Sequence, residues 1–158
     1  YNHFQDKANL FTCAIEQSCE ESIRTRPIHL QQDSNFEEVL GQICHLALNI
    51  IYLPEALKLE HLLLELAAEQ NPLAEPFYNA SHKRLYMVWA DFFEQAIRLG
   101  FVENVSVEKQ VHLLLSLLLG HRHHEILLGV RDIPTAEESK QIIADAIELF
   151  LMKYQKSA

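Results

Sequence analysis

The chain has 158 residues, about half of them hydrophobic, with only four glycines and five prolines. This length and composition suit one domain with a sizeable core and exclude a disordered chain. The formal net charge of −9 is a poor match to a phosphate backbone, so DNA binding would need a locally basic segment, and none is visible. No apolar run is long enough to span a bilayer, so we expect no membrane partner.

Three cysteines, Cys13, Cys19 and Cys44, are present in an odd number and without a C-x-x-C pair. Cys13 and Cys19 are six residues apart, which places them on different faces of one helix. This usage is typical of reduced thiols in a cytoplasmic protein and argues against a disulfide framework.

The first residues predict a helix junction. Tyr1 and Phe4 are three apart and share a helical face, and Asp6 then offers the N-cap of a new helix. We expect that helix to cover residues 7–25, because Pro27 stops it. The chain begins without Met, so we expect another segment before it, and we divide it into residues 1–5 and 6–158.

The following helices are predicted from caps, prolines and apolar periodicity. Ser34 and Glu37 form a capping box for the second helix, and Pro54 suits the first turn of a third helix that ends near residue 70. Pro76 suggests a short fourth piece before a long helix over residues 81–99, which Gly100 ends. The pattern contains no strand and no repeat, so the fold class is an all-α bundle of about six helices.

The last two helices carry more apolar surface than one core needs. Ser106 opens a fifth helix that is apolar almost all round, and Thr135 and Glu138 form the capping box of the sixth. Surplus apolar surface on two adjacent helices is what a symmetric four-helix dimer interface requires. We therefore predict a homodimer whose interface includes Leu114, Leu118, His121, Ile143, Ile147, Phe150 and Tyr154.

Aromatic residues at helical spacing suggest either core packing or one wall of a ligand pocket. Apolar residues on the first three helices could face that wall, with a histidine supplying polarity. The candidate ligand-binding residues are Phe11, Ile43, Ala47, His61, Leu62, Leu66, Tyr86, Trp89 and Phe93. The corresponding effector is a small apolar or aromatic molecule with few charges.

The most conspicuous polar cluster is the segment 120–125, GHRHHE. It could hold a metal or form a polar kink in the fifth helix, and we favour the kink because neither the zincin nor the di-iron spacing is present. No nucleophile elbow or phosphate-binding loop is present either. We therefore expect no metal, no cofactor, no catalytic residue and no enzyme activity.

The junction resembles that of TetR-family transcription regulators, in which Y-x-x-F ends the DNA-reading helix and K-x-x-L-F begins the connecting helix. Tyr1, Phe4, Lys7, Leu10 and Phe11 match those patterns. The segment 66–78, LAAEQNPLAEPFY, resembles an E-x-x-x-P-E-L-x-x-x-F-Y segment of the AefR-like subgroup, with a spacing shorter by one after its first glutamate. The order of helices is similar over the whole chain.

The resemblance implies a ligand-responsive regulator, expected to be a repressor, that dimerises through its last two helices. Residues 1–5 would be the remnant of a helix-turn-helix head, and residues 6–158 the ligand-binding and dimerisation domain. Tyr1, His3 and Lys7 would then lie near operator DNA, which the head binds. The alternative is a helical dimer without a DNA role that acts as an adaptor or as a carrier of an apolar ligand.

Overall fold

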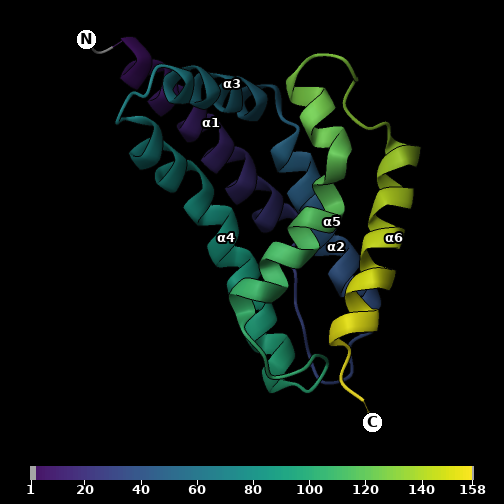
Figure 1. Ribbon diagram of the computed structural model, residues 1–158. Helices are drawn as coiled ribbons and strands as arrows, with labels where there is room; N and C mark the ends of the chain where they lie inside the picture. The colour runs from purple at the N-terminus through teal and green to yellow at the C-terminus, as the bar shows by residue number, and fades with distance from the viewer. Residues whose placement is uncertain (1–2, 158) are drawn as a thin grey trace. The chain divides into compact units, whose positions relative to one another are not determined.

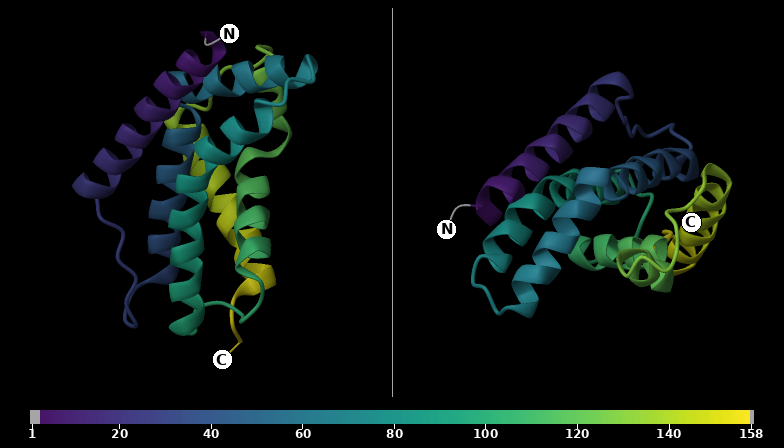
Figure 2. Two further views of the ribbon diagram at one scale, coloured as in Figure 1. Left: turned by 90° about the vertical axis from the view of Figure 1, so that its left-hand side faces the viewer. Right: turned by 90° about the horizontal axis from the view of Figure 1, so that it is seen from above.

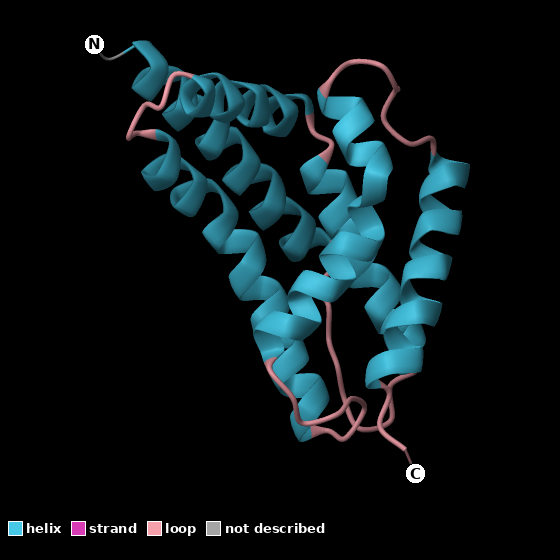
Figure 3. Ribbon diagram, viewed as in Figure 1, coloured by secondary structure: helices cyan, strands magenta, loops and turns pink. Residues whose placement is uncertain are grey.

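The computed structural model describes residues 3–157, which form six α-helices and no β-strand (Figures 1 and 3). The helices are α1 (His3–Thr25), α2 (Phe36–Ile51), α3 (Pro54–Ala68), α4 (Ala74–Arg98), α5 (Val107–Leu127) and α6 (Ala136–Tyr154). The predicted all-α fold class is therefore confirmed.

Most helix boundaries follow the predicted local signals. Pro54 occupies the first turn of α3, where its missing N–H costs nothing. Gly100 follows α4 with a φ of 80°, the left-handed conformation that glycine adopts without strain. Thr135 caps α6: its hydroxyl accepts from the Glu138 N–H, and the Glu138 carboxylate accepts from the Thr135 N–H.

Three predicted boundaries are wrong. The helix does not restart at Asp6, because α1 continues from His3 and Asp6 lies in its first turn, where a carboxylate complements the helix dipole. The cap of α2 is Asn35 rather than Ser34: the Asn35 side chain accepts from the Glu38 N–H at 3.2 Å. A break near Ser81 is absent, because Pro76 falls in the first turn of one continuous α4 and leaves the helix intact.

The helices divide into two compact units. The first unit comprises the chain up to residue 27 together with residues 49–85, and so contains α1, α3 and the beginning of α4. The second unit comprises residues 28–48 and the chain from residue 86 onward. In the first unit α1 lies against α3 (Figure 1). Its buried cluster is aliphatic and is bordered by half-buried apolar side chains; the buried members are Ala8, Leu59, Leu62, Leu63 and Leu66.

The core of the second unit combines aliphatic side chains with a cluster of aromatic rings. Phe36 of α2 stacks between Phe92 and Phe101, with ring centroids 5.9 and 5.0 Å away. Phe93 of α4 and Phe150 of α6 are 5.3 Å apart and are both fully buried. These ring contacts join α2, α4 and α6, while α5 and α6 lie side by side (Figure 2).

Helix α5 is kinked at Gly120, whose φ of 57° and ψ of −164° are not helical. The Arg122 guanidinium donates a hydrogen bond of 2.7 Å to the Leu118 carbonyl oxygen and so satisfies a group that the kink removes from the helix ladder. The predicted polar kink in this segment is therefore confirmed.

Across the described part of the chain, no single helix is long and apolar enough to cross a membrane. Taken together, α2 and α3 form a bent pair whose length and apolar composition would suffice, and nothing beyond length and composition supports such a span.

Candidate functional site

Four of the predicted ligand-binding residues lie in the first unit. Phe11 of α1 packs at the edge of the aliphatic cluster that contains Leu62 and Leu66 of α3, so the structure brings these three together. His61 is on the same helix but is exposed to solvent. Because α3 buries one stripe, a residue adjacent to Leu62 points to a different face.

The other five predicted ligand-binding residues lie in the second unit. Ile43 and Ala47 of α2 are buried, and so are Trp89 and Phe93 of α4, whose rings meet edge to face at 6.3 Å. Tyr86, one turn earlier on α4, is 37% exposed, and its ring centroid is 6.3 Å from that of His112 on α5. The structure thus places four of the five side chains in the interior of this unit.

Buried polar atoms without partners mark the second unit. Among the described residues, three buried side-chain atoms have no hydrogen-bond partner: Trp89 Nε1, Gln110 Oε1 and Arg122 Nε. Gln110 is a fully buried polar residue of α5, and its amide nitrogen donates to the Glu103 carbonyl oxygen at 3.1 Å. Sequence reasoning missed Gln110, because a single glutamine beside the apolar run of α5 gives no sign of its burial.

Most of the predicted dimer residues are buried within the fold. Leu114, Leu118, Ile143, Ile147, Phe150 and Tyr154 are each at most 8% exposed, whereas His121 is exposed. The apolar side chains that the last two helices and the loop between them do expose are not among the predicted residues. Leu128 is 64% exposed, Leu149 50% and Met152 77%. Periodicity therefore did not show which faces of these two helices point outward.

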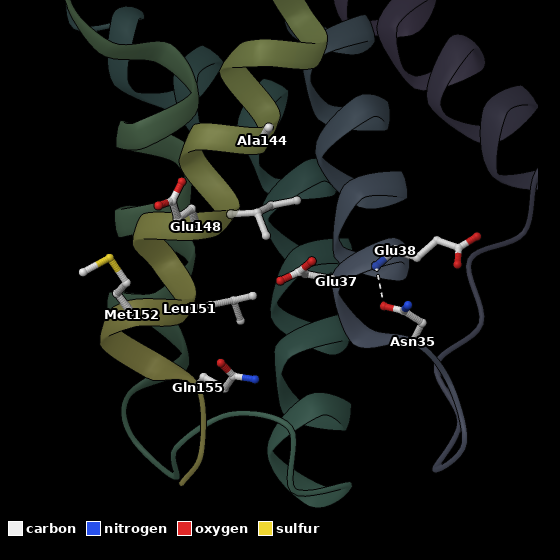
Figure 4. A pocket seen from close by; sticks show the side chains of 9 residues that line it. Asn35, Glu37, Glu38, Ala144, Glu148, Leu151, Met152 and Gln155 are labelled. Atoms are coloured by element: carbon white, nitrogen blue, oxygen red, sulfur yellow. Dashed lines mark hydrogen bonds between the residues drawn. The ribbon is translucent and has the colours of Figure 1, made fainter.

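A groove of about 650 Å³ lies in the second unit between the start of α2 and the end of α6 (Figure 4). Its floor is formed by apolar side chains of α6, including Ile147 and Leu151, and its rim carries Glu37, Glu38 and Glu148. These carboxylates are exposed and therefore solvated. The groove was not predicted, because it brings together segments more than 100 residues apart.

The predicted DNA-binding residues belong to the start of α1. Tyr1 lies outside the described residues. His3 and Lys7 are both exposed, and the His3 ring lies edge-on to Phe4 with centroids 6.3 Å apart.

Two ion pairs of the first unit link α4 to other helices. His82 Nε2 of α4 lies 2.9 Å from the Glu60 carboxylate of α3, and its ring stacks on Tyr78 at 4.3 Å. Burial lowers the pKa of His82, but the hydrogen bond and charge of Glu60, together with the hydrogen bond to the Tyr78 carbonyl oxygen, outweigh it, so the net shift is upward. Arg84 lies 3.3 Å from Glu20 of α1, so both pairs tie α4 to a neighbouring helix of this unit.

The three cysteines differ in exposure. Cys13 is exposed, whereas Cys19 and Cys44 are buried, and burial raises the pKa of both buried thiols. Over residues 3–157, no group of three or more His, Cys, Asp or Glu side chains is arranged to hold a metal ion.

Three solved structures share the fold of this chain, and two of them are named as TetR-family regulators. A protein from Mesorhizobium loti assigned to the TetR family is 18% identical, with a TM-score of 0.72 over 96% of this chain and 71% of that one. The flavonoid-responsive regulator FrrA is 24% identical, with a TM-score of 0.70 over 100% of this chain and 80% of that one. A TetR-family regulator from Pseudomonas syringae pv. tomato is 10% identical, with a TM-score of 0.60 over 89% of this chain and 72% of that one.

These likenesses define the fold class as the helical body of a TetR-type regulator. No curated protein sequence matches the chain. The sequence pattern of the AefR-like transcriptional repressor C-terminal domain matches residues 38–156, which is about three quarters of the chain. The chain therefore belongs to the TetR family of transcription regulators and contains an AefR-like C-terminal domain, as the resemblance of its junction and of residues 66–78 predicted.

Proposed function

We propose that this chain is the effector-binding and dimerising body of a transcriptional repressor that releases its operator DNA when a small apolar or aromatic molecule binds. The observation that carries the proposal is the match of residues 38–156 to the C-terminal domain of AefR-like repressors. DNA would be read by a helix-turn-helix head joined before α1, since a formal net charge of −9 makes this chain a poor match to a phosphate backbone.

The buried side chains support an apolar or aromatic effector. Helix bundles bind small molecules between helices, in sites lined mostly by apolar residues with a few polar groups. The aromatic side chains of Trp89 and Phe93 and the aliphatic Ile43 and Ala47 provide such a lining within the second unit. A fold relative whose name describes it as flavonoid-responsive makes an aromatic effector the first class to test.

The proposed dimer uses α5 and α6, but through their exposed residues. Leu149 and Met152 on α6, with Leu128 at the end of α5, offer apolar surface that is solvated in one chain. The Met152 side chain projects outward from α6 (Figure 4). Burying such side chains against a second copy is favourable by about 25 cal/mol per Å² of apolar surface.

The proposed mechanism is a shift between head spacings. Two heads of a dimer bind half-sites about 34 Å apart, one helical turn of DNA. An effector that binds one spacing better than the other shifts the population away from DNA-competent dimers. A coupling free energy of about 1–3 kcal/mol changes DNA affinity about 5- to 150-fold, and α1 is the helix that would connect body and head.

The proposal is tested with the full-length protein and DNA from the promoter of its own coding region. We expect fluorescence anisotropy to show DNA binding that weakens at least about fivefold when 7-hydroxyflavone is added. Release by simple aromatic compounds would also support the proposal. Binding of such compounds without any DNA binding at low salt would instead favour the adaptor or carrier.

The dimer interface is tested by Met152→Glu. A charge at the centre of an apolar contact must be desolvated without a partner, so we expect the mass measured by sedimentation to fall from two chains to one. Met87→Glu is the matched control, because Met87 is 50% exposed on α4, outside the proposed interface, and should leave the dimer intact. Dimers that persist with Met152→Glu would exclude this face.

A further inference from the structure

We propose that Trp89 and Gln110 are the two hydrogen-bonding contacts of the effector, and that the effector is an aromatic compound with both an acceptor oxygen and a hydroxyl group. The indole N–H of Trp89 would donate to the acceptor oxygen, and the Gln110 side-chain oxygen would accept from the hydroxyl. This inference rests on the proposed function and specifies the chemistry of its ligand. Both residues lie in the second unit.

Both atoms are buried and have no partner among the described residues. Trp89 is 1% exposed and Gln110 is fully buried, so neither group exchanges hydrogen bonds with bulk water. A buried donor or acceptor left unpaired costs about 1–3 kcal/mol, which is why most such groups in folded proteins are paired. The second unit retains three such atoms, and a polar ligand would supply the missing partners of two of them, Trp89 Nε1 and Gln110 Oε1.

The orientation of the Gln110 amide is fixed by its other hydrogen bond. Its nitrogen donates to the Glu103 carbonyl oxygen, and the Glu103 N–H in turn donates to the Tyr154 carbonyl oxygen at 2.8 Å. If the amide were reversed, its oxygen would face a carbonyl oxygen, so the free group is the acceptor. Gln110 therefore presents an acceptor that is already oriented before any ligand arrives.

The indole of Trp89 is fixed by aromatic packing. Its ring meets Phe93 edge to face, and Phe93 in turn contacts Phe92 at 5.4 Å and Phe150 at 5.3 Å. The Trp89 indole is 1% exposed and packs on a ring that is itself held by two others, so it loses little further entropy when a ligand binds, which favours affinity. The free N–H of Trp89 is a donor only, so its partner must carry an acceptor.

The two residues lie at similar heights on neighbouring helices. The lower part of α4 and α5 run side by side in opposite directions (Figure 2), and the ring contact between Tyr86 and His112 marks one shared level. Trp89 is three residues after Tyr86 on α4, and Gln110 is two residues before His112 on α5. Because the two helices run in opposite directions, both residues are displaced from the ring contact toward the same end of the helix pair. Both residues therefore lie on the same side of that ring contact and within about one helical turn of it.

One donor and one acceptor from the protein define the ligand class. Phenols that also bear a carbonyl or ring oxygen, such as hydroxylated flavones, have both groups on a flat apolar body. A site with buried hydrogen-bonding groups discriminates strongly against an analogue that lacks the matching group, because the protein group is then left unpaired. A hydrocarbon of the same size is therefore expected to bind poorly.

The test compares flavone, which has the acceptor carbonyl only, with 7-hydroxyflavone, which adds the hydroxyl. Binding to the purified chain is measured by calorimetry and by quenching of Trp89, the single tryptophan of the chain. One hydrogen bond in a buried site gives about a tenfold preference, so we expect wild-type protein to bind 7-hydroxyflavone about tenfold more tightly than flavone.

Two variants assign the contacts. Gln110→Met removes the acceptor, so the preference for 7-hydroxyflavone should fall to about one. Trp89→Phe removes the donor, so both compounds should bind about tenfold more weakly while their ratio persists. Phe92→Leu is the control: it alters a buried side chain of α4 without a polar atom, and the tenfold ratio should remain. The ratio within one variant is insensitive to any change in its stability.

Three results would overturn the inference. These are a wild-type preference near one, a preference that survives in Gln110→Met, and flavone affinity unchanged by Trp89→Phe. If Trp89 and Gln110 had only a structural role, both substitutions would lower the melting temperature of the unliganded protein. The ratio of the affinities for 7-hydroxyflavone and flavone would then be the same in both variants as in the wild type. If flavone and 7-hydroxyflavone bind equally and both release DNA, the repressor function stands and only this assignment fails. If neither binds, the ligand class proposed here is wrong.

Discussion

The two units differ in where they place their polar groups. In the first unit, the buried cluster is aliphatic and the charged pairs, such as His82 with Glu60, lie at partly exposed positions. In the second unit, the core adds a cluster of aromatic rings to its aliphatic side chains and contains the buried Trp89 and Gln110. All three unpartnered buried side-chain atoms of the described residues belong to this unit.

This difference predicts that the first unit contributes mainly to stability and the second mainly to ligand selectivity. An aliphatic cluster with its charges outside gains stability from burial but distinguishes poorly between ligands of similar size. A core with fixed, unpaired hydrogen-bonding groups gives up some stability and gains chemical selectivity. We therefore expect substitutions in the first unit to act mainly on stability, and selected ones in the second unit to act on ligand choice.

The largest expected effect is that of Leu66→Ala in the first unit. Leu66 is fully buried in the α1–α3 cluster, and such truncations cost about 2–5 kcal/mol of unfolding free energy. Urea denaturation followed by circular dichroism measures this loss. Leu64→Ala on the same helix, where the side chain is 51% exposed, should change stability by less than about 0.5 kcal/mol. Equal losses for the two variants would contradict an aliphatic core at this face.

A smaller effect is expected at the kink of α5. Gly120 has a φ of 57° that side chains rarely adopt, so Gly120→Ala should destabilise the second unit by about 1–3 kcal/mol. The matched variant is Gly41→Ala in the interior of α2, where the added methyl group would meet only Ile147 at 3.9 Å. Helix propensity predicts a gain of about 0.5–1 kcal/mol there. Thermal unfolding that moves in the same direction for both would show that α5 is not kinked in solution.

The smallest effect concerns His82. Its folded-state pKa is raised above the ordinary 6.5, so the pair with Glu60 stabilises fully below about pH 6.5 and this contribution disappears as pH rises through the folded-state pKa. Because both side chains are partly exposed, the change is expected to be about 0.2–1 kcal/mol. His82→Gln should remove this pH dependence, and Glu60→Gln should remove its stabilising sign, since burial lowers the pKa of His82 once Glu60 is absent. A pH slope of the same sign and size in His82→Gln would assign it to another group.

Local signals in the sequence were sufficient for most of the fold. Pro54, Gly100 and the Thr135 capping box act through their own backbone neighbours, so their positions could be predicted without tertiary information. The errors arose where one residue type serves two roles. Asp6 is as suitable in a first helical turn as at an N-cap, and Pro76 is tolerated in a first turn although it breaks a helix interior.

The candidate site was predictable only in part. Apolar periodicity correctly placed Trp89 and Phe93 in the interior, because a stripe on a helix indicates its buried face. It could not show that Leu118 and Phe150 face their own core, since an all-round apolar helix has no marked outer side. The burial of Gln110 and the absence of a partner for its oxygen depend on segments brought together by folding, so no local pattern predicts them.

Because the cysteines differ in exposure, a thiol reagent can label one of them, Cys13, selectively. A maleimide reacts with the thiolate form, so it should modify the exposed Cys13 and leave the two buried thiols intact in the folded protein. Cys13 is on α1, the helix proposed to connect body and head. In the proposed dimer, spin labels on two such cysteines would report the distance between the two α1 helices before and after an effector is added, without any engineered residue.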